Sequence, residues 1–309
     1  MARRTIDLEA PLDLRVVVGL HVRGRGDPTA RLSSVAVARA TRTADGPATL
    51  LAEVRGTRVE AEAWGPGADR VLDGLPALLG LLDDPAGFDP SRHALVADLA
   101  RRRTGLRLGW TGAVFEALLP AILEQKVTGR EAATALIGLT RRYGEPAPGA
   151  VAAAQKLRLQ PAPEVVAALP YYAFHPFGVE QRRAEVIRRV SRDAARLEAL
   201  GGLPGSRIEV GAAAAARLRT YAGIGPWTAA EVTLRALGDP DAVSVGDFHL
   251  PNLVAFALAG ESRGTDDRML ELLSPWRGHR ARVIRLLELS GIEAPRYGPR
   301  YSPPDRRSM

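Results

Sequence analysis

The spacing of apolar residues changes partway along the chain, and this change limits the possible folds more than any other feature of the sequence. Up to about residue 90, short runs rich in β-branched and other apolar residues occupy residues 14–23, 34–39, 49–54 and 57–63. Turn-forming pairs stand near these runs, at Asp45-Gly46 and Arg55-Gly56. The runs predict an antiparallel sheet, and residues 68–82 predict a helix that covers it.

Beyond this point the apolar residues follow a helical period. Residues 92–103 are amphipathic, and residues 113–124 are apolar on most faces, as expected of a buried helix. Thr128 and Glu131 match a capping box, so we predict a helix from there to Tyr143. Further helices are predicted over residues 163–169, 179–200, 212–221, 226–237, 249–258, 267–273 and 278–289.

These patterns predict an α+β protein. Residues 1–104 are expected to form an N-terminal domain of antiparallel sheet with helices, and residues 105–294 an all-helical domain. Residues 295–309 carry prolines and arginines without apolar spacing, and we predict a flexible tail there. At 309 residues and 46% hydrophobic content, the chain is long enough to build two packed cores.

The composition excludes several classes of protein. The sequence has no cysteine, which rules out disulfides, zinc sites with cysteine ligands and iron–sulfur clusters. No apolar run is long enough to span a membrane, and the first residues lack the apolar stretch of a secretion signal. We therefore expect a cytoplasmic protein without a membrane partner.

The charge of the chain indicates a polyanionic partner. The net charge is +7, and Lys126 and Lys156 are the only lysines among the 42 basic residues, the others being arginines. Arginine binds phosphate through two hydrogen bonds and stacks on nucleobases. The codon usage of a GC-rich genome explains most of the arginine preference, but the positive net charge still favours nucleic acid.

Residues 218–231 form the most specific local pattern. An alanine-rich helix is predicted to end at Gly223-Ile224-Gly225, and a second helix begins at Pro226, a favoured first helical residue. The two glycines allow positive φ and leave backbone N–H groups uncovered at a helix start, where an anion such as a DNA phosphate can bind. The pattern predicts a helix–hairpin–helix, although a simple tight turn explains the same residues about as often.

A single acidic residue follows the hairpin by about twenty positions. Asp247 comes after an apolar run and precedes the predicted helix over residues 249–258. Because aspartate is a favoured helix N-cap, its position alone favours a role as the N-cap of that helix. The alternative is a functional carboxylate.

These segments together resemble a known family. The hairpin and the following Gly246-Asp247 are similar to the helix–hairpin–helix DNA glycosylase superfamily, and within it the chain resembles the AlkA-type DNA-3-methyladenine glycosylases II. Other segments match in the same order, namely the β-rich start after residues 10–13 (APLD), residues 105–109 (GLRLG), residues 121–128 (AILEQKVT) and residues 275–277 (PWR). The resemblance spans roughly residues 10 to 290.

The resemblance assigns roles to individual residues. It implies that Asp247 is the catalytic aspartate. It also implies that the damaged base is held in a pocket lined by Gln125, Trp227, Phe248 and Trp276, and that a DNA phosphate is held at the hairpin by Gly223, Ile224, Gly225 and Thr228. No cofactor and no catalytic metal are expected, but a structural monovalent cation beneath the hairpin is compatible with the family. Each tryptophan also has an ordinary alternative role as a core residue.

The sequence departs from the family at positions that matter for chemistry. Members that also cleave the DNA strand carry a lysine nucleophile where this chain has Trp227, and a Schiff base needs an amine. Lys126 stands where relatives insert an apolar wedge into DNA, and its charge would prefer phosphate, so the wedge role stays open. Glu231 stands where some relatives have a further aromatic residue. The aromatic segment 171–177 has no family role and is expected to pack in the core.

The function implied is that of a monofunctional DNA N-glycosylase in base excision repair. It would act as a monomer, associated with the nucleoid, on double-stranded DNA that contains alkylated purines such as 3-methyladenine. Two alternatives remain open. One is a non-catalytic DNA-binding protein that uses the hairpin, and the other is a glycosylase of the same fold for an oxidised or deaminated base.

Overall fold

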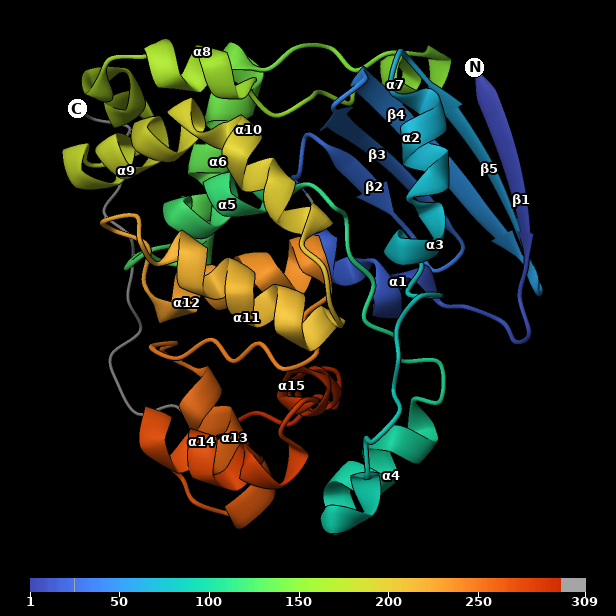
Figure 1. The fold of residues 1–309 in the computed structure, drawn as a ribbon, viewed down its shortest axis with the longest axis vertical. Helices are drawn as coiled ribbons and strands as arrows, with labels where there is room; N and C mark the ends of the chain where they lie inside the picture. Colours follow the sequence, from blue (N-terminus) through green and yellow to red (C-terminus); the bar gives the residue numbers. More distant parts are fainter. Residues whose placement is uncertain (25, 296–309) are drawn as a thin grey trace.

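The N-terminal part of the protein is a five-stranded antiparallel sheet. The computed structural model describes residues 1–24 and 26–295, and its strand order is β1-β5-β4-β3-β2. The strands are β1 (Ala2–Asp7), β2 (Ala30–Leu32), β3 (Ala36–Thr43), β4 (Gly46–Arg55) and β5 (Arg58–Trp64). Figure 1 shows the sheet beside the helical part of the molecule.

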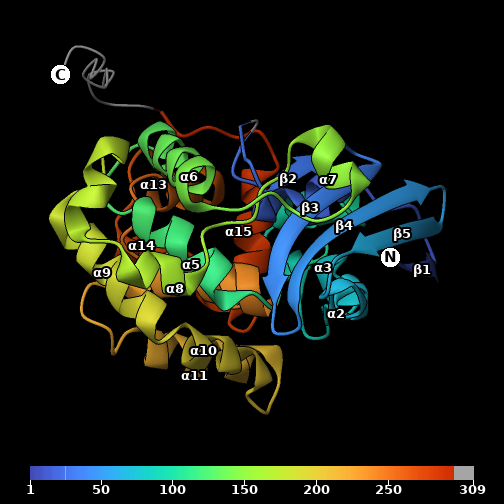
Figure 2. The same ribbon diagram turned by 90° about the horizontal axis from the view of Figure 1, so that it is seen from above.

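Two layers cover the sheet. Helices α2 (Ala68–Asp73) and α3 (Leu75–Leu78) lie over one face, where α2 contacts β4, β5 and β1. The short helix α7 (Ala150–Gln155) lies over the other face, against β3 and β4 (Figure 2). The alternation of buried and half-exposed residues along β5 fits the side covered by α2, because Val59, Ala61 and Ala63 face that core while the residues between them point away from it.

The predicted strand over residues 14–23 is wrong. These residues form a short helix, α1 (Leu14–Val17), and a 3-10 turn, η1 (Gly19–His21). Asp13 caps α1 by accepting a hydrogen bond from the backbone N–H of Arg15, and the buried residues Leu14, Val17 and Val18 have helical spacing. One edge of the sheet is formed by β1, which pairs with β5 and was not predicted from the sequence.

A first group of helices surrounds the largest apolar core of the described residues. Its members are α5 (Val114–Leu123), α6 (Gly129–Tyr143), α8 (Pro163–Ala168), η3 (Tyr171–Phe177), α9 (Gln181–Arg192), α10 (Ala194–Glu198), η4 (Ala199–Gly202), α11 (Arg207–Leu218) and α12 (Pro226–Val232), which continues into a π-helical turn, η5 (Thr233–Leu237). Helix α5 is central, with nearly every side chain buried, as predicted. The predicted capping box of Thr128 and Glu131 is present at the start of α6.

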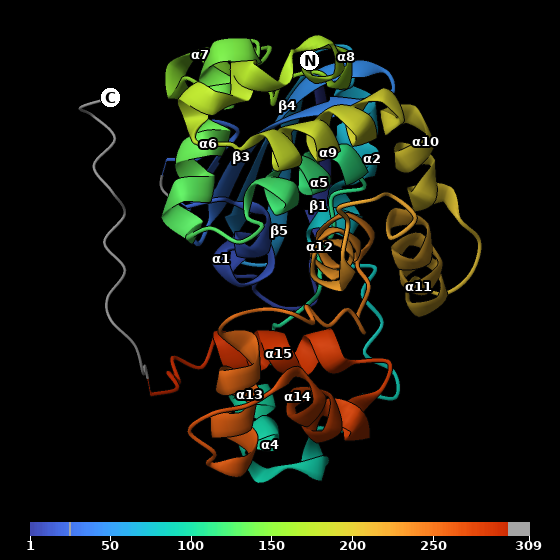
Figure 3. The ribbon, with the colours of Figure 1, turned by 90° about the vertical axis from the view of Figure 1, so that its left-hand side faces the viewer.

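A second helical group has its own core. It consists of η2 (Pro90–Arg92), α4 (Ala94–Arg102), α13 (Leu250–Ala259), α14 (Asp266–Leu273), η6 (Ser274–Trp276) and α15 (Arg280–Glu288). Helix α4 belongs to this group although it comes early in the chain. The second helical group therefore contains helices from both sides of the predicted domain boundary at residue 104. Residues 238–249 connect α12 to α13 between the two groups (Figure 3).

Ion pairs join the N-terminal part of the chain to the helices. Arg282 of α15 makes two hydrogen bonds of 2.8 and 2.7 Å to Asp83, and Arg39 of β3 pairs with Glu116 of α5 at 2.7 Å. A buried charge is costly when its partner is removed, so these pairs favour the observed packing of the N-terminal part against the helices. The predicted tail beyond residue 295 lies outside the described residues. In the described part of the chain, no helix is both long and apolar enough to cross a membrane.

Candidate active site at a helix–hairpin–helix

Helices α11 and α12 form the predicted hairpin. Gly223 has φ of +96°, and a Cβ atom there would lie 2.3 Å from Cγ2 of Val186 in α9, so both the turn and the packing require glycine. Gly225 differs from the expectation, because its φ of −91° and ψ of 179° are extended values that any residue adopts. A Cβ atom at Gly225 would meet no atom within 4 Å, so this position is open.

Gln125 braces the hairpin from the turn after α5. Its side-chain Nε2 donates hydrogen bonds of 2.9 Å to the carbonyl of Gly223 and of 2.9 Å to Oγ1 of Thr228. The side-chain amide of Gln125 thus links the hairpin turn at Gly223 to the first turn of α12 at Thr228. Ile224 is buried beneath the loop in the main helical core, which anchors the turn from below.

The carbonyl groups of the hairpin do not favour a bound cation. The carbonyl of Tyr221 accepts the N–H of Ile224 at 2.9 Å, and that of Gly223 accepts Gln125. The carbonyl of Ala222 accepts the guanidinium of Arg189 at 2.8 Å. This guanidinium brings a positive charge to the loop, which disfavours a cation at the carbonyl of Ala222.

Asp247 is held by three N–H donors. Its Oδ1 accepts the backbone N–H groups of His249 at 2.7 Å and Leu250 at 2.8 Å, and its Oδ2 accepts the indole Nε1–H of Trp227 at 3.0 Å. The first two bonds satisfy backbone N–H groups at the start of α13, but the N-cap position is His249, so Asp247 holds the helix start from two residues upstream and is not its N-cap. The third bond ties the same half-buried carboxylate to the first turn of α12.

Trp227 connects the hairpin to this carboxylate. It is half-buried, and its ring packs against the core of the first helical group. Thr228, the next residue, accepts a hydrogen bond from Gln125. Two adjacent residues of α12 therefore bind the side chains of Asp247 and Gln125, which come from separate segments of the chain. The structure thereby brings together Asp247, Trp227, Gln125 and the hairpin.

Two other predicted site residues lie on the surface. Phe248 is 84% exposed, and its ring contacts His249 edge-on with centroids 4.9 Å apart. Lys126 is exposed in the turn after α5 and has a left-handed backbone, with φ of 54°. Both side chains are open to solvent.

Trp276 lies apart from the exposed residues. It is only 4% exposed, it belongs to the core of the second helical group, and its indole N–H donates to the carbonyl of Asp89 at 2.8 Å. This is the core role weighed for it from sequence. The structure does not bring its ring to an open surface beside Asp247.

A polar network that the sequence analysis missed continues along α12. Ser244 donates to Oε1 of Glu231 at 2.6 Å, and Arg235 forms an ion pair with Oε2 of the same residue. Arg235 also donates to the carbonyl of Leu20 at 3.2 Å, so the network reaches the N-terminal part. The spacing of Glu231 and Arg235 by four residues in a predicted helix was a usable signal for their pairing.

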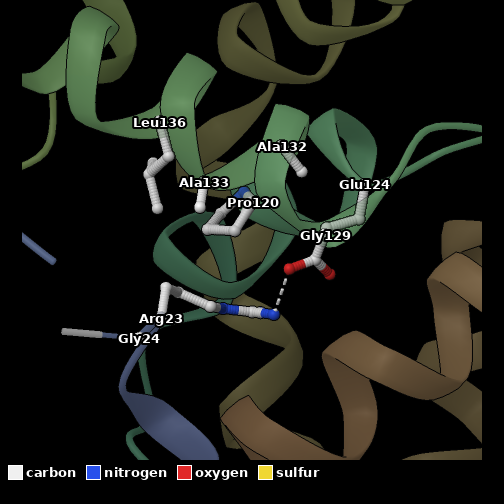
Figure 4. Close-up of a pocket in the computed structure, with 8 residues that line it drawn as sticks. All are labelled: Arg23, Gly24, Pro120, Glu124, Gly129, Ala132, Ala133 and Leu136. Carbon is white, nitrogen blue, oxygen red and sulfur yellow. Dashed lines mark hydrogen bonds and ion pairs between the residues drawn. The ribbon is translucent and has the colours of Figure 1, made fainter. Parts of the chain in front are cut away.

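A second ion pair lies close to this network. Arg23 contacts Glu124 at 2.6 Å and borders a cavity of about 210 Å³ between residues 23–24 and helices α5 and α6 (Figure 4). Burial, followed by the charge of Arg235, lowers the pKa of Arg23. Burial also lowers the pKa of His21 well below its usual value, with the charges of Arg39 and Arg235 acting in the same direction.

Within residues 1–24 and 26–295, no group of three or more acidic or histidine side chains is arranged to hold a metal ion. The chemistry of the candidate site is thus considered for the hairpin and the carboxylate of Asp247.

Comparison with solved structures identifies the fold. No protein-family model and no curated protein sequence match the chain. Among solved structures, the 3-methyladenine DNA glycosylase from Archaeoglobus fulgidus aligns with a TM-score of 0.76 at 20% identity, over 94% of this chain and 98% of that one. An 8-oxoguanine glycosylase/lyase from Clostridium acetobutylicum, in its apo form, aligns with a TM-score of 0.69 at 12% identity, over 93% and 96% of the two chains.

The same Clostridium enzyme in complex with double-stranded DNA, with cytosine opposite 8-oxoguanine, aligns with a TM-score of 0.66 at 12% identity, over 92% of this chain and 96% of that one. At such identities the likeness shows the fold. The predicted α+β architecture is confirmed, and the chain has the fold of the helix–hairpin–helix DNA glycosylases.

Proposed function

We propose that this protein is a monofunctional DNA glycosylase that hydrolyses the N-glycosidic bond of alkylated purines in base excision repair. The observation that carries the proposal is the fixed carboxylate of Asp247, bonded at 3.0 Å to Trp227 in the first turn of the hairpin's second helix. Holding the start of α13 needs only the two bonds from His249 and Leu250. The third bond orients the other carboxylate oxygen relative to the hairpin.

The chemistry of base loss suits a carboxylate in this position. When an alkylated, positively charged base departs, the sugar becomes an oxocarbenium-like cation. A preorganised negative charge stabilises that cation, and it acts strongly where water is excluded. Water then adds to the sugar carbon and loses a proton, which leaves an abasic site and a free base. Asp247 would supply the charge and orient the water.

The partner in this proposal is double-stranded DNA that contains a damaged base. The target nucleotide must leave the helical stack before its glycosidic bond becomes accessible. The hairpin, with its open Gly225, would contact the phosphate backbone without reading sequence. A net charge of +7 favours such contact.

The tryptophan at position 227 favours simple hydrolysis over strand cleavage. Strand-cleaving relatives form a Schiff base through a lysine at the position of Trp227, and an indole cannot do so. The sequence has only two lysines, Lys126 and Lys156, and Lys156 ends helix α7 on the sheet. We therefore propose a hydrolase without lyase activity.

Two alternatives make different predictions. A non-catalytic DNA-binding protein would use the hairpin but release no base. A glycosylase for oxidised or deaminated bases would release 8-oxoguanine or hypoxanthine faster than methylated purines. The three-point fixation of Asp247 favours an enzyme, because binding alone does not require an oriented carboxylate.

The decisive experiment is base release from duplex oligonucleotides. Substrates carry 3-methyladenine, 7-methylguanine, hypoxanthine or 8-oxoguanine, and free bases are separated by chromatography under single-turnover conditions. We expect release of the methylated purines and its loss by at least a hundredfold in Asp247→Asn, with DNA affinity retained. The asparagine keeps the bonds to the start of α13 but not the charge. Normal rates in this variant, or no release by the wild type, would exclude the proposal.

A further inference from the structure

Helix α9 carries a group of exposed arginines beside the hairpin. Three of its five arginines are exposed, and we call these three the α9 arginine face: Arg182, Arg189 and Arg192. Arg182 and Arg189 are about two helical turns apart, and Arg192 follows one turn later, so all three project from one side of the helix. The face is a positive strip about 15 Å long.

The charges of this face are not neutralised within the described part of the chain. The other two arginines of α9 are bound inside the protein, because Arg183 is buried and Arg188 pairs with Glu185 at 2.9 Å. Asp193, just after α9, accepts the hydroxyl of Tyr221 at 2.9 Å. No carboxylate of the described residues forms an ion pair with the α9 arginine face. A strip of uncompensated positive charge attracts a polyanion.

Arg189 joins this face to the hairpin. Its guanidinium donates to the carbonyl of Ala222 at 2.8 Å. Val186, one turn earlier in α9, lies so close to the next hairpin residue, Gly223, that a Cβ atom there would be 2.3 Å from Cγ2 of the valine. Because α9 contacts two successive residues of the loop, its exposed arginines lie beside the surface that the hairpin presents.

The bond to Ala222 also prepares Arg189 for a second acceptor. A guanidinium has five N–H donors in a planar fork, and the carbonyl of Ala222 occupies one side of it while the residue stays exposed. The orientation of the side chain is thus fixed before a ligand arrives, which lowers the entropy cost of binding. Phosphate oxygens are the acceptors that match an arginine fork best.

We propose that the α9 arginine face binds the DNA backbone next to the hairpin, with Arg189 bridging the carbonyl of Ala222 and a phosphate. The inference rests on the proposed function only in taking DNA as the partner, and it extends the contact from the hairpin loop to helix α9. Contacts between arginine and phosphate carry no sequence information, so the face holds damaged and undamaged DNA alike.

The test is binding to undamaged duplex DNA, followed by fluorescence anisotropy over a range of salt concentrations. Each phosphate contact adds about 0.9 to the slope of log affinity against log salt concentration. The triple variant Arg182→Gln, Arg189→Gln, Arg192→Gln should therefore lower the slope by about 2–3, and Arg189→Gln alone by about 1. Arg189→Lys keeps the charge and should keep the slope. Thermal unfolding of the triple variant should match the wild type, since all three residues are exposed.

A charge-matched variant separates the α9 arginine face from the net charge of the protein. Arg3, Arg55 and Arg58 are exposed on strands of the sheet and at the turn between them. Their triple replacement by glutamine removes the same amount of charge and should leave the slope unchanged. The inference is overturned if the α9 variant keeps the wild-type slope, or if the two triple variants lower it equally.

A cross-linking experiment tests the contact directly. The sequence has no cysteine, so Arg192→Cys carries a single thiol. Duplexes with a thiol tether on successive backbone phosphates should form a disulfide with Arg192→Cys and not with the control Arg58→Cys. Reaction at neither residue, or at both to the same extent, would reject the placement of DNA along α9.

The binding readout also separates this inference from the proposed function. A salt slope that depends on the α9 arginine face, in a protein that releases no base from any lesion, would reject the glycosylase and keep the DNA surface. Base release from methylated DNA, with a slope that does not depend on this face, would reject the surface and keep the glycosylase.

Discussion

Replacement of Trp227 by phenylalanine tests whether the indole N–H acts through Asp247. The substitution keeps an aromatic face in the first turn of α12 and removes the donor that lies 3.0 Å from Oδ2 of Asp247. If Trp227 only packs in the core or only stacks on a base, phenylalanine should replace it with little loss of rate. If it orients the carboxylate, the chemical step should slow.

The structure bounds the size of this effect. A hydrogen bond to a charged group contributes about 1.5–3 kcal/mol, which corresponds to roughly 10- to 150-fold in rate if it is lost entirely in the transition state. Two bonds of 2.7 and 2.8 Å continue to hold Oδ1, so Asp247 stays at the start of α13 and only the direction of Oδ2 is freed. We therefore expect a loss near the lower end, about tenfold, with little change in DNA affinity.

The assay is a double-mutant cycle in single-turnover base release at saturating enzyme. Trp227→Phe should slow the wild type about tenfold but have almost no further effect in Asp247→Asn, because the two changes act on one interaction. Trp276→Phe is the matched control, since it removes an indole donor bonded to the carbonyl of Asp89. It should lower stability by about 1 kcal/mol and leave the rate unchanged. Equal slowing by Trp227→Phe in both backgrounds would refute a role through Asp247.

Three further outcomes are expected. Borohydride should trap no covalent complex with abasic or lesion-containing DNA, because residue 227 is a tryptophan; a trapped adduct would contradict the hydrolytic mechanism. Gly223→Ala should lower stability by about 1–3 kcal/mol because of its positive φ and the contact with Val186, whereas Gly225→Ala should fold normally and weaken binding to all DNA sequences alike. Burial raises the pKa of Asp239 from 3.8 to about 6, so the folded state holds a proton that the unfolded state releases, and stability should fall as pH rises from about 4 to about 6. Denaturant unfolding across this window should show that slope in the wild type and its reduction in Asp239→Asn.

Local patterns were sufficient for most of the fold. The strands β3, β4 and β5 and the helices α5 and α6 have the periods, turns and caps that were used to predict them. Residues 14–23 were misassigned because their β-branched composition was weighed above the helical spacing of the buried residues and the Asp13 cap. Propensity is the weaker of these signals when tertiary packing selects the buried face.

The candidate site was predictable only in part. The hairpin and Asp247 lie on contiguous motifs, so sequence was sufficient to locate them. The exposure of Phe248 and the burial of Trp276 depend on how distant segments pack, and neither follows from the residue type or its neighbours. The same holds for Arg189, which reaches the hairpin carbonyl of Ala222 from α9.

The donors around Asp247 bear on which damaged bases the proposed enzyme would release. A methylated, cationic purine leaves as a neutral molecule, whereas a neutral base such as hypoxanthine leaves readily only if an acid protonates it. The three N–H groups bonded to Asp247 come from Trp227, His249 and Leu250, and all three point at the carboxylate. They are committed to fixing the negative charge and are not free to assist a leaving base. An arrangement of this kind stabilises the sugar cation but supplies no proton to the leaving base, so it favours substrates whose base already carries the positive charge.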